Sequence, residues 1–423
     1  MIICMVVLLT TMLLGLPIAF SVGLAALAYF AVADVSLMIL AQKVVGQLSV
    51  VPLLAVPFFI LAGELMNRGG ITIRIFLFAL AIIGRIPGCL GYANVLASMV
   101  FAGISGSSVA DVAGLGKVEM AAMRRHRYPD DLSIGVTVSS SVVGGIIPPS
   151  INAVIFGSMA AVPIGPLFLA GVFPGVLAGL LMMVTFGILF ARRGAVADEV
   201  EPIRFFGALR HSFGALLTPI VLLGSMFTGV ATPTEAAVLA CVYATVLSGI
   251  VYRELSLAEF LGCVLRSAVL SGAVLLMIGF AAPLGYMVAR DRVAAELMLF
   301  LIGTLSNPTV LVLSFLVLML VVGMFLEVAA AIILLTPIIY PAMIILGYDP
   351  VHIGIIIVFG LGIGLITPPI GLCLFVGSQI SGMSLQKVSN AASPYIVSLI
   401  IVLLITTFIP QFSLLVPQLV YGR

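Results

Sequence analysis

The sequence predicts an all-α, polytopic integral membrane protein made of two inverted repeats, each with a re-entrant helical hairpin and a broken helix. Hydrophobic residues make up 63% of the 423 residues and charged residues only 8%. A soluble domain with this balance would expose large apolar surfaces. Apolar runs of about 20 residues, long enough to cross the hydrocarbon core, recur from end to end. Double prolines interrupt two such runs, at Pro148-Pro149 and Pro368-Pro369.

The first half of the chain predicts scaffold spans followed by a hairpin and a broken helix. Residues 3–33 are apolar and have neither a basic leader nor a small-residue cleavage site, so they predict a retained first span. A second span, a short amphipathic piece, a Gly/Ser-interrupted hairpin, a broken helix and a further span follow. Their expected ranges are, in this order, 47–66, 73–86, 89–123, 132–162 and 166–191, before a polar loop at 192–211.

The second half repeats this order. A shift of 220 positions places Gly144 on Gly364 and Pro148 on Pro368, and matched Gly and Pro mark backbone breaks rather than shared apolar composition. The expected elements are spans at 213–230, 232–252 and 267–288, a short piece at 294–305, a hairpin at 309–346, a broken helix at 351–380 and a last span at 394–417.

These elements predict a division into two repeats. The first repeat covers 1–191, with scaffold spans in 1–88 and the hairpin and broken helix in 89–165. A cytoplasmic loop covers 192–211. The second repeat covers 212–423, with scaffold spans in 212–290 and the hairpin and broken helix in 309–380.

The placement of Lys and Arg predicts the orientation. If the loop with Arg192 and Arg193 is cytoplasmic, most other basic residues fall on the same side, which fits the positive-inside rule. Only Lys43, Arg290, Arg292 and Arg423 then lie outside. The same alternation lets the first hairpin enter from the cytoplasm and the second from outside, so the two repeats are inverted.

Each hairpin tip is expected to face the break of its own repeat. A double proline removes two backbone donors, and irregular backbone at membrane depth is tolerated only where it is buried or lines a wet cavity. Carbonyl and hydroxyl oxygens there can replace the water shell of Na⁺. The predicted first sodium site is Gly103, Ser105, Ser107, Ser108, Gly144, Ile147, Pro148 and Ser150. The predicted second sodium site is Gly323, Glu327, Gly364, Thr367, Pro368 and Ile370.

The half-helices that restart after each break present free amides and a positive dipole end, which suits an anionic substrate. The predicted substrate-binding residues are Ser107, Asn152, Glu327 and Gly371. Glu327, at the second tip, is the best candidate for binding an ion directly or for a role in gating. Packing alone remains an alternative for the Gly and Ser residues, because small residues are common at helix contacts in membranes.

Several charges fall in or near apolar runs, where they are costly. They are Glu64, Asp111, Lys117, Glu119, Glu235 and Glu327. For Glu64, Lys117 and Glu119 structural pairing or interfacial placement is favoured. No histidine or cysteine has a metal-spaced partner and no phosphate loop is present, so an enzyme is not predicted. No cofactor is expected besides Na⁺ as a coupling ion, and an ion gradient has to supply the energy.

Four strings in order closely resemble the large membrane subunit of TRAP transporters, the tripartite ATP-independent periplasmic systems. They are Ser105-Gly106-Ser107-Ser108-Val109-Ala110-Asp111, Ile147-Pro148-Pro149-Ser150, Gly229-Val230-Ala231-Thr232-Pro233-Thr234-Glu235-Ala236-Ala237 and Gly364-Leu365-Ile366-Thr367-Pro368-Pro369. The resemblance runs over essentially the whole chain. It implies an elevator-type sodium symporter in the bacterial inner membrane, whose tips and breaks match the family's sodium-site regions.

The resemblance also implies partners. A periplasmic binding protein would deliver an organic acid, such as a C4-dicarboxylate or sialic acid, and a small four-span membrane subunit would be a separate chain. No nucleic-acid partner is expected. A cation channel with re-entrant pore loops is the alternative, and a membrane enzyme is weaker still, because no catalytic pair lies within the membrane.

Overall fold

A computed structural model describes residues 2–84, 86–194, 204–292, 296 and 307–422, without the side chains of residues 2 and 102–105. The regular elements of this part of the chain are all helical. Eight of its helices are long and apolar enough to cross a membrane. The all-α membrane fold class is therefore confirmed. The expected short piece at 294–305 lies outside the described residues except for Glu296.

The N-terminal region differs from the prediction. The single span expected at 3–33 is wrong, because the structure has two helices there, α1 (Ile2–Leu13) and α2 (Ile18–Val32), which pack against each other. Gly15 between them has φ of 82°, a left-handed conformation that favours glycine and turns the chain. A third helix that was not predicted, α3 (Leu37–Leu48), starts where the Ser36 hydroxyl accepts a hydrogen bond from the Met38 amide.

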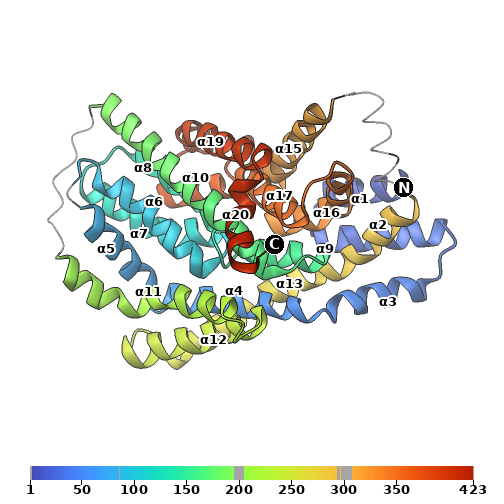
Figure 1. The fold of residues 1–423 in the computed structure, drawn as a ribbon, viewed down its shortest axis with the longest axis horizontal. Helices are drawn as coiled ribbons and strands as arrows, with labels where there is room; N and C mark the ends of the chain where they lie inside the picture. The colour runs from blue at the N-terminus through green and yellow to red at the C-terminus, as the bar shows by residue number, and fades with distance from the viewer. Residues whose placement is uncertain (1, 85, 195–203, 293–295, 297–306, 423) are drawn as a thin grey trace.

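The helices that correspond to the expected scaffold spans are α4 (Ala55–Arg68), α5 (Ile71–Ile83), α11 (Phe205–Phe227), α12 (Pro233–Val246) and α13 (Leu257–Arg290). Together with α3 they are called the scaffold below. In Figure 1, α11, α4 and α12 lie along the lower long edge of the molecule. Helix α12 packs on α4 and α11, and α13 packs on α2, α3 and α4. Since α11 already begins at Phe205, the loop expected at 192–211 is shorter than predicted.

Capping boxes fix two of these helix starts. The Thr232 hydroxyl accepts from the Glu235 amide while the Glu235 carboxylate accepts from the Thr232 amide at 2.8 Å. Ser256 and Glu259 form the same box at the start of α13. The second cap explains why α13 starts at Leu257, ten residues before the expected 267, and the first gives Glu235 a structural role.

Two helical hairpins and two broken helices are present, as predicted. The hairpins are α6 (Cys89–Ser105) with α7 (Ser108–Arg125), and α15 (Pro308–Phe325) with α16 (Val328–Ile345). The first broken helix is α8 (Asp130–Ser140), a 3-10 turn (Ser141–Gly145) and α9 (Ile151–Ala160), and the second is α17 (Pro350–Gly364) and α18 (Leu372–Ser381). A shift of 220 places α7 on α16. Both tips are shorter than expected, so Gly103 and Gly323 lie in the last turns of α6 and α15 rather than in the turns.

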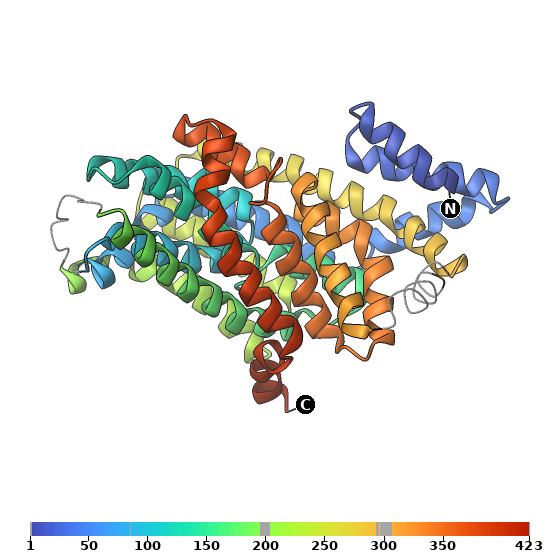
Figure 2. The same cartoon turned by 90° about the horizontal axis from the view of Figure 1, so that it is seen from above.

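The two repeats interlock. Helix α7 of the first hairpin packs on α18 of the second repeat, and α16 of the second hairpin packs on α9 of the first. The helices that follow the broken helices, α10 (Ile164–Arg192) and α19 (Leu385–Phe408), cross over likewise, α10 onto α17 and α19 onto α8. Figure 2 shows α19 crossing the middle of the molecule. Each hairpin is therefore supported by the other repeat.

The last span also differs from the prediction. The structure ends α19 at Phe408 and starts a separate helix, α20 (Gln411–Tyr421), so a single span at 394–417 is wrong. Pro410 lacks an amide donor and interrupts the helix. Buried His352 of α17 contacts the Thr407 carbonyl at 3.2 Å and the Ser413 hydroxyl at 2.5 Å, which holds α20 against α17.

The charges in apolar segments divide into three kinds. Glu64 pairs with Arg266 at 3.1 Å across α4 and α13, which confirms the expected pairing. Lys117 is exposed. Glu119 is buried rather than interfacial, and its Oε1 has no hydrogen-bond partner among the described residues, so the expected pairing or interfacial placement is wrong for this residue.

A stripe of glycines on α10 covers the first break. A Cβ on Gly171 would lie 2.2 Å from the Ile146 carbonyl oxygen, and one on Gly175 would lie 2.4 Å from the Ile147 side chain. One turn further, a Cβ on Gly179 would meet the Met99 sulfur at 2.3 Å. Small residues at this spacing let helices approach closely in a membrane, so α10 seals the first break from one side.

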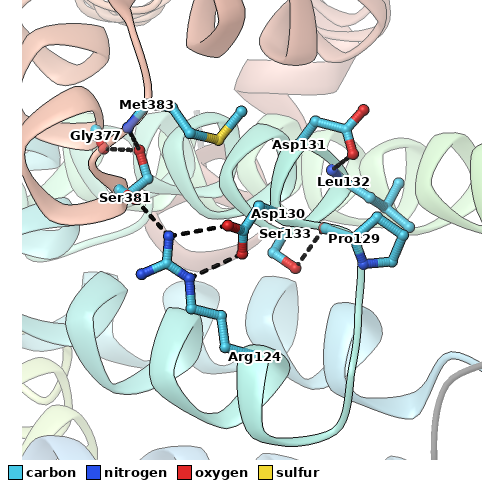
Figure 3. Close-up of polar contacts among 9 residues, drawn as sticks. All are labelled: Arg124, Pro129, Asp130, Asp131, Leu132, Ser133, Gly377, Ser381 and Met383. Atoms are coloured by element: carbon cyan, nitrogen blue, oxygen red, sulfur yellow. Dashed lines mark hydrogen bonds and ion pairs between the residues drawn. The ribbon is translucent and has the colours of Figure 1, made fainter.

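An ion pair ties the first hairpin to both broken helices (Figure 3). The Arg124 guanidinium, at the end of α7, donates to both carboxylate oxygens of Asp130, at 2.8 and 3.2 Å, where α8 begins. The same guanidinium donates to the Ser381 carbonyl at the end of α18. The Ser381 hydroxyl donates to the Gly377 carbonyl at 2.7 Å and caps the Met383 amide. Three segments thus meet on one side chain.

Replacing Arg124 with Ala should weaken this junction. Because both partners are partly exposed, the ion pair contributes about 0–1 kcal/mol and the bond to Ser381 about 1 kcal/mol, so we expect Tm in detergent to fall by about 1–3 °C. The matched control is Arg125→Ala, since Arg125 makes none of these contacts. Equal Tm values for the two variants would contradict the structural role.

The glycine stripe gives a second prediction. Gly171→Ala places a Cβ against backbone, which cannot move aside, so we expect a loss of about 2 kcal/mol or more in stability. Gly179→Ala meets a flexible Met side chain and should cost less. Gly224→Ala on α11 meets nothing within 4 Å and should be neutral or stabilising. The fraction of each variant that remains monodisperse in size-exclusion chromatography after heating ranks the three by stability. The prediction fails if Gly171→Ala is as stable as Gly224→Ala.

Candidate functional site

The first hairpin tip lies against the first break. Gly106, the turn residue with φ of 61°, approaches so closely that a Cβ would lie 2.8 Å from the Pro149 carbonyl oxygen and 2.9 Å from the Ile151 amide. The structure therefore brings together the tip and the break that the sequence predicts as one site. Gly103 and Ser105 fall in 102–105, whose side chains are outside the described residues.

One hydroxyl at this junction is unpartnered. Ser108 Oγ is buried and forms no hydrogen bond within the described part of the chain. It lies 3.1 Å, and Asn152 Nδ2 3.5 Å, from the position that a Cβ on Gly145 would take. Ser107 instead caps α7, accepting from the Ala110 amide at 3.4 Å. Ser108 and Asn152 are thus the polar side chains that meet at Gly145.

Ser150 holds the break in place. Its hydroxyl donates to the Gly145 carbonyl at 2.6 Å and accepts from the Ala153 amide at 3.2 Å. The hydroxyl therefore bridges the end of the 3-10 turn and the start of α9. A structural role accounts for this side chain without an ion.

The second tip meets the second break through glycines. A Cβ on Gly364 would lie 2.5 Å from the Gly323 Cα, and a Cβ on Gly323 would lie 2.6 Å from the Leu361 carbonyl oxygen. The Gly371 amide donates to the Met324 carbonyl at 3.0 Å, and the Cys373 amide donates to the Leu365 carbonyl at 3.0 Å. The tip thus satisfies the Gly371 amide and the break itself satisfies the Cys373 amide, at a helix start that would otherwise lack partners.

The two polar side chains of the second junction are engaged locally. The Glu327 carboxylate is half-buried and caps α16 by accepting from the Ala329 amide at 2.8 Å. The Thr367 hydroxyl donates to the Ile363 carbonyl at 2.8 Å, within its own helix turn. Glu327 therefore places a carboxylate at the tip, while the Thr367 hydroxyl already donates its hydrogen to a backbone carbonyl.

Free carbonyls recur at equivalent positions of both breaks. Within the described residues, the carbonyls of Ile147 and Pro148 accept no hydrogen bond, and those of Thr367 and Pro368 accept none either. Both Pro-Pro peptide bonds are cis. A hard monovalent cation prefers such oxygens, so each junction presents carbonyl groups of the right kind.

The two breaks differ in exposure. Residues 141–150 are buried except for half-buried Ile147, whereas Pro368, Pro369 and Ile370 are exposed. Pro368 and Pro369 line a cavity of about 670 Å³ together with residues at the start of α19. The second break is therefore accessible in this conformation, and the first is closed.

A larger cavity, of about 810 Å³, lies between the scaffold and the hairpins. Scaffold helices α3 and α13 form one wall, with Lys43 and Arg292, and α9 and α16 form the other, with Thr336 and Tyr340. The four predicted substrate residues do not line it. Sequence reasoning missed this cavity as a site, although Lys43 and Arg292 were visible as rare basic residues on the expected outer side.

Comparisons with known proteins agree with this fold. Residues 4–412 match the family described as tripartite ATP-independent periplasmic transporter, DctM component. The sialic acid TRAP transporter large permease protein SiaM of Vibrio cholerae is 38% identical over 410 residues, covering 96% of each chain. The C4-dicarboxylate TRAP transporter large permease protein DctM of Pseudomonas aeruginosa is 36% identical over 367 residues, 86% of each chain.

Longer relatives are also similar. The sialic acid TRAP transporter permease protein SiaT of Haemophilus influenzae is 35% identical over 99% of this chain and 68% of its own length. Among solved structures, the YdaH transporter of Alcanivorax borkumensis has a TM-score of 0.63 at 18% identity, covering 91% of this chain and 89% of that chain. This likeness concerns the fold alone.

These relatives are permease subunits rather than enzymes. The eight helices that could cross a membrane agree with a multi-pass protein of the bacterial inner membrane. The matched family model spans nearly the whole chain, including both hairpins and both breaks. The chain belongs to the tripartite ATP-independent periplasmic transporter family and is a DctM component, the large permease.

Proposed function

We propose that this chain couples the entry of Na⁺ to the import of an organic anion. The observation that carries the proposal is the pair of tip–break junctions, each of which leaves carbonyl oxygens without hydrogen bonds at equivalent positions. Unwound backbone of this kind coordinates Na⁺ in other transporters. The first site would use Ser108 and the Ile147 and Pro148 carbonyls. The second would use Glu327 and the Thr367 and Pro368 carbonyls.

The substrate we propose is an organic acid, such as sialic acid or a C4-dicarboxylate, the solutes in the names of the relatives. Helices α9 and α18 start at the breaks and direct their N-termini towards the junctions, which favours an anionic group. Asn152 and Gly371 are positioned at these starts, and Ser107 is at the start of α7 in the first tip. Lys43 and Arg292, in the large cavity, support attraction of an anion.

We further propose an elevator movement. The interlocked hairpins and broken helices would slide as a unit past the scaffold defined above. The cavity between these two parts supports such a boundary. A small membrane subunit, with four spans and as a separate chain, would extend the scaffold, and a periplasmic binding protein would deliver the anion.

Uptake into proteoliposomes tests the coupling. The complete transporter, with its binding protein loaded with sialic acid or a C4-dicarboxylate, is assayed with an inward Na⁺ gradient and with choline⁺ in its place. We expect accumulation only with Na⁺. Accumulation that is equal in choline⁺ would reject sodium coupling, and unitary currents in bilayer recordings would favour a channel instead.

Ser108 provides a prediction for the first site. Because its buried hydroxyl has no protein partner, Ser108→Ala should raise the Na⁺ concentration for half-maximal uptake by about 3–10-fold, the effect of losing about 1 kcal/mol of binding. Thr367→Ala should have a smaller effect, since its hydroxyl is bonded to Ile363. The control is Ser393→Ala, at an exposed serine on α19. A Na⁺ requirement in Ser108→Ala equal to that in the control would count against the site.

A further inference from the structure

Small residues make room for the large cavity between the scaffold and the hairpins. On α3 and α13 the residues that line it include Gly46, Ala282, Gly285 and Ala289. A Cβ on Gly285 would meet only the Pro337 ring of α16, at 3.9 Å. The volume of about 810 Å³ is in the range of pockets that bind small organic molecules. The cavity can therefore hold a solute of the size of an organic acid.

Two cations in this cavity have no counter-ion. Lys43 of α3 and Arg292, which follows the end of α13, both line it. Neither forms an ion pair within the described part of the chain, and the described residues that line the cavity include no Asp or Glu. Asp291 is next in sequence, but it is not part of the lining and accepts a hydrogen bond from the Tyr29 hydroxyl at 2.5 Å. The lining therefore carries a net positive charge.

Two neutral side chains of the same cavity lack hydrogen-bond partners. Gln47 Nε2 on α3 and Thr336 Oγ1 on α16 are buried atoms that form no hydrogen bond within the described residues, and Thr336 is only 3% exposed. The amide nitrogen can only donate, and the hydroxyl can donate as well. Buried polar groups without partners are costly, so a ligand that carries several acceptor oxygens would relieve both.

An aromatic ring holds one of the cations at the cavity wall. Lys43 Nζ lies 5.4 Å from the centre of the Tyr286 ring, a contact that restricts the ammonium group without neutralising its charge. On the opposite wall, Tyr340 packs edge-on against Phe156 of α9, with 5.8 Å between the ring centres. The scaffold wall thus supplies the positive charge, and the wall of α9 and α16 supplies the Thr336 hydroxyl.

We propose that this cavity is an anion-binding site, in which Lys43 and Arg292 bind the carboxylate of the organic acid before the acid reaches the tip–break junctions. Gln47 and Thr336 would donate to its other oxygens. The proposal rests on the import of an organic anion proposed above and adds a second, separate place that binds it. In the orientation that the basic residues predict, Lys43 and Arg292 lie on the outer side, so an incoming anion would meet this cavity first.

A single tryptophan tests binding without transport. The chain contains no Trp, so Tyr286→Trp places the only indole of the purified chain beside Lys43. We expect its fluorescence to change saturably with sialic acid or with succinate, a C4-dicarboxylate, at constant ionic strength. N-acetylmannosamine, a neutral sugar, should cause no change. Tyr340→Trp reports from the opposite wall and covers the case that Tyr286→Trp does not fold.

Charge removal in the tryptophan variant then identifies the ligands. Lys43→Gln and Arg292→Gln should each raise the half-saturating concentration of the acid about tenfold or more, since a charge-assisted hydrogen bond to the carboxylate is lost. Arg290→Gln is the matched control, because Arg290 is an exposed cation at the same end of α13 that does not line the cavity. We expect its half-saturating concentration to stay within about twofold. An equal rise in the control would overturn the site, because long-range attraction alone would then account for binding.

Two further outcomes would overturn the proposal. One is a tryptophan variant that does not respond to an acid which the complete transporter imports into proteoliposomes. The other is a response to phosphatidylglycerol in nanodiscs with none to the free acids, which would assign the cations to a lipid headgroup. If the complete transporter imports neither acid, the proposed import of organic acids is itself rejected.

Discussion

The structure depends on how two stretches of non-helical backbone are accommodated inside an apolar protein. Each break leaves amides and carbonyls that a membrane cannot hydrate. The opposing tip satisfies part of them: the Met324 carbonyl accepts from the Gly371 amide, and Gly106 lies within contact of Pro149 and Ile151. What remains without a partner is a small set of carbonyls at matched positions. The candidate site thus consists of the few backbone carbonyls that the fold leaves without hydrogen bonds.

Interlocking makes this arrangement rigid. Since α7 packs on α18 and α16 packs on α9, neither hairpin can leave its break without disturbing the other repeat. Arg124 adds a polar junction where α7, α8 and α18 end or begin. The symmetry is not complete, however, because the first break is covered by α10 and the second is exposed. Two similar junctions therefore have different access to the surroundings.

Much of the fold could be predicted because Gly and Pro mark it. The double prolines located both breaks, and the shift of 220 matched the two repeats, which the structure confirms by placing α7 on α16. Other helix start and stop signals did not enter the prediction. Gly15 and Pro17 lie between the first two helices, and Pro410 follows the end of α19. Ser256 and Glu259 form the cap of α13. These signals were readable in the sequence, so the errors came from relying on apolar length.

The candidate site was harder to predict in detail. That Ser150 and Thr367 use their hydroxyls for the backbone, whereas Ser108 does not, depends on distances that spacing does not reveal. The burial of Asp111 is likewise a property of packing that its place in the sequence does not reveal. Lys43 and Arg292 are far apart in the chain and meet at one cavity only through the fold. Residue types in the sequence suggested which kind of ligand the site could bind, but only the tertiary structure shows which side chains are free to bind it.

The glycines of α10 limit where any shear surface in this protein can be. Gly171 and Gly175 bring α10 so close to Ile146 and Ile147 that the side chains on one face interdigitate with backbone on the other. Surfaces that interdigitate at this depth cannot glide over each other. In the elevator movement proposed above, helix α10 would therefore move together with the first break rather than stay with the scaffold, although its length alone would have suggested a fixed membrane-spanning helix.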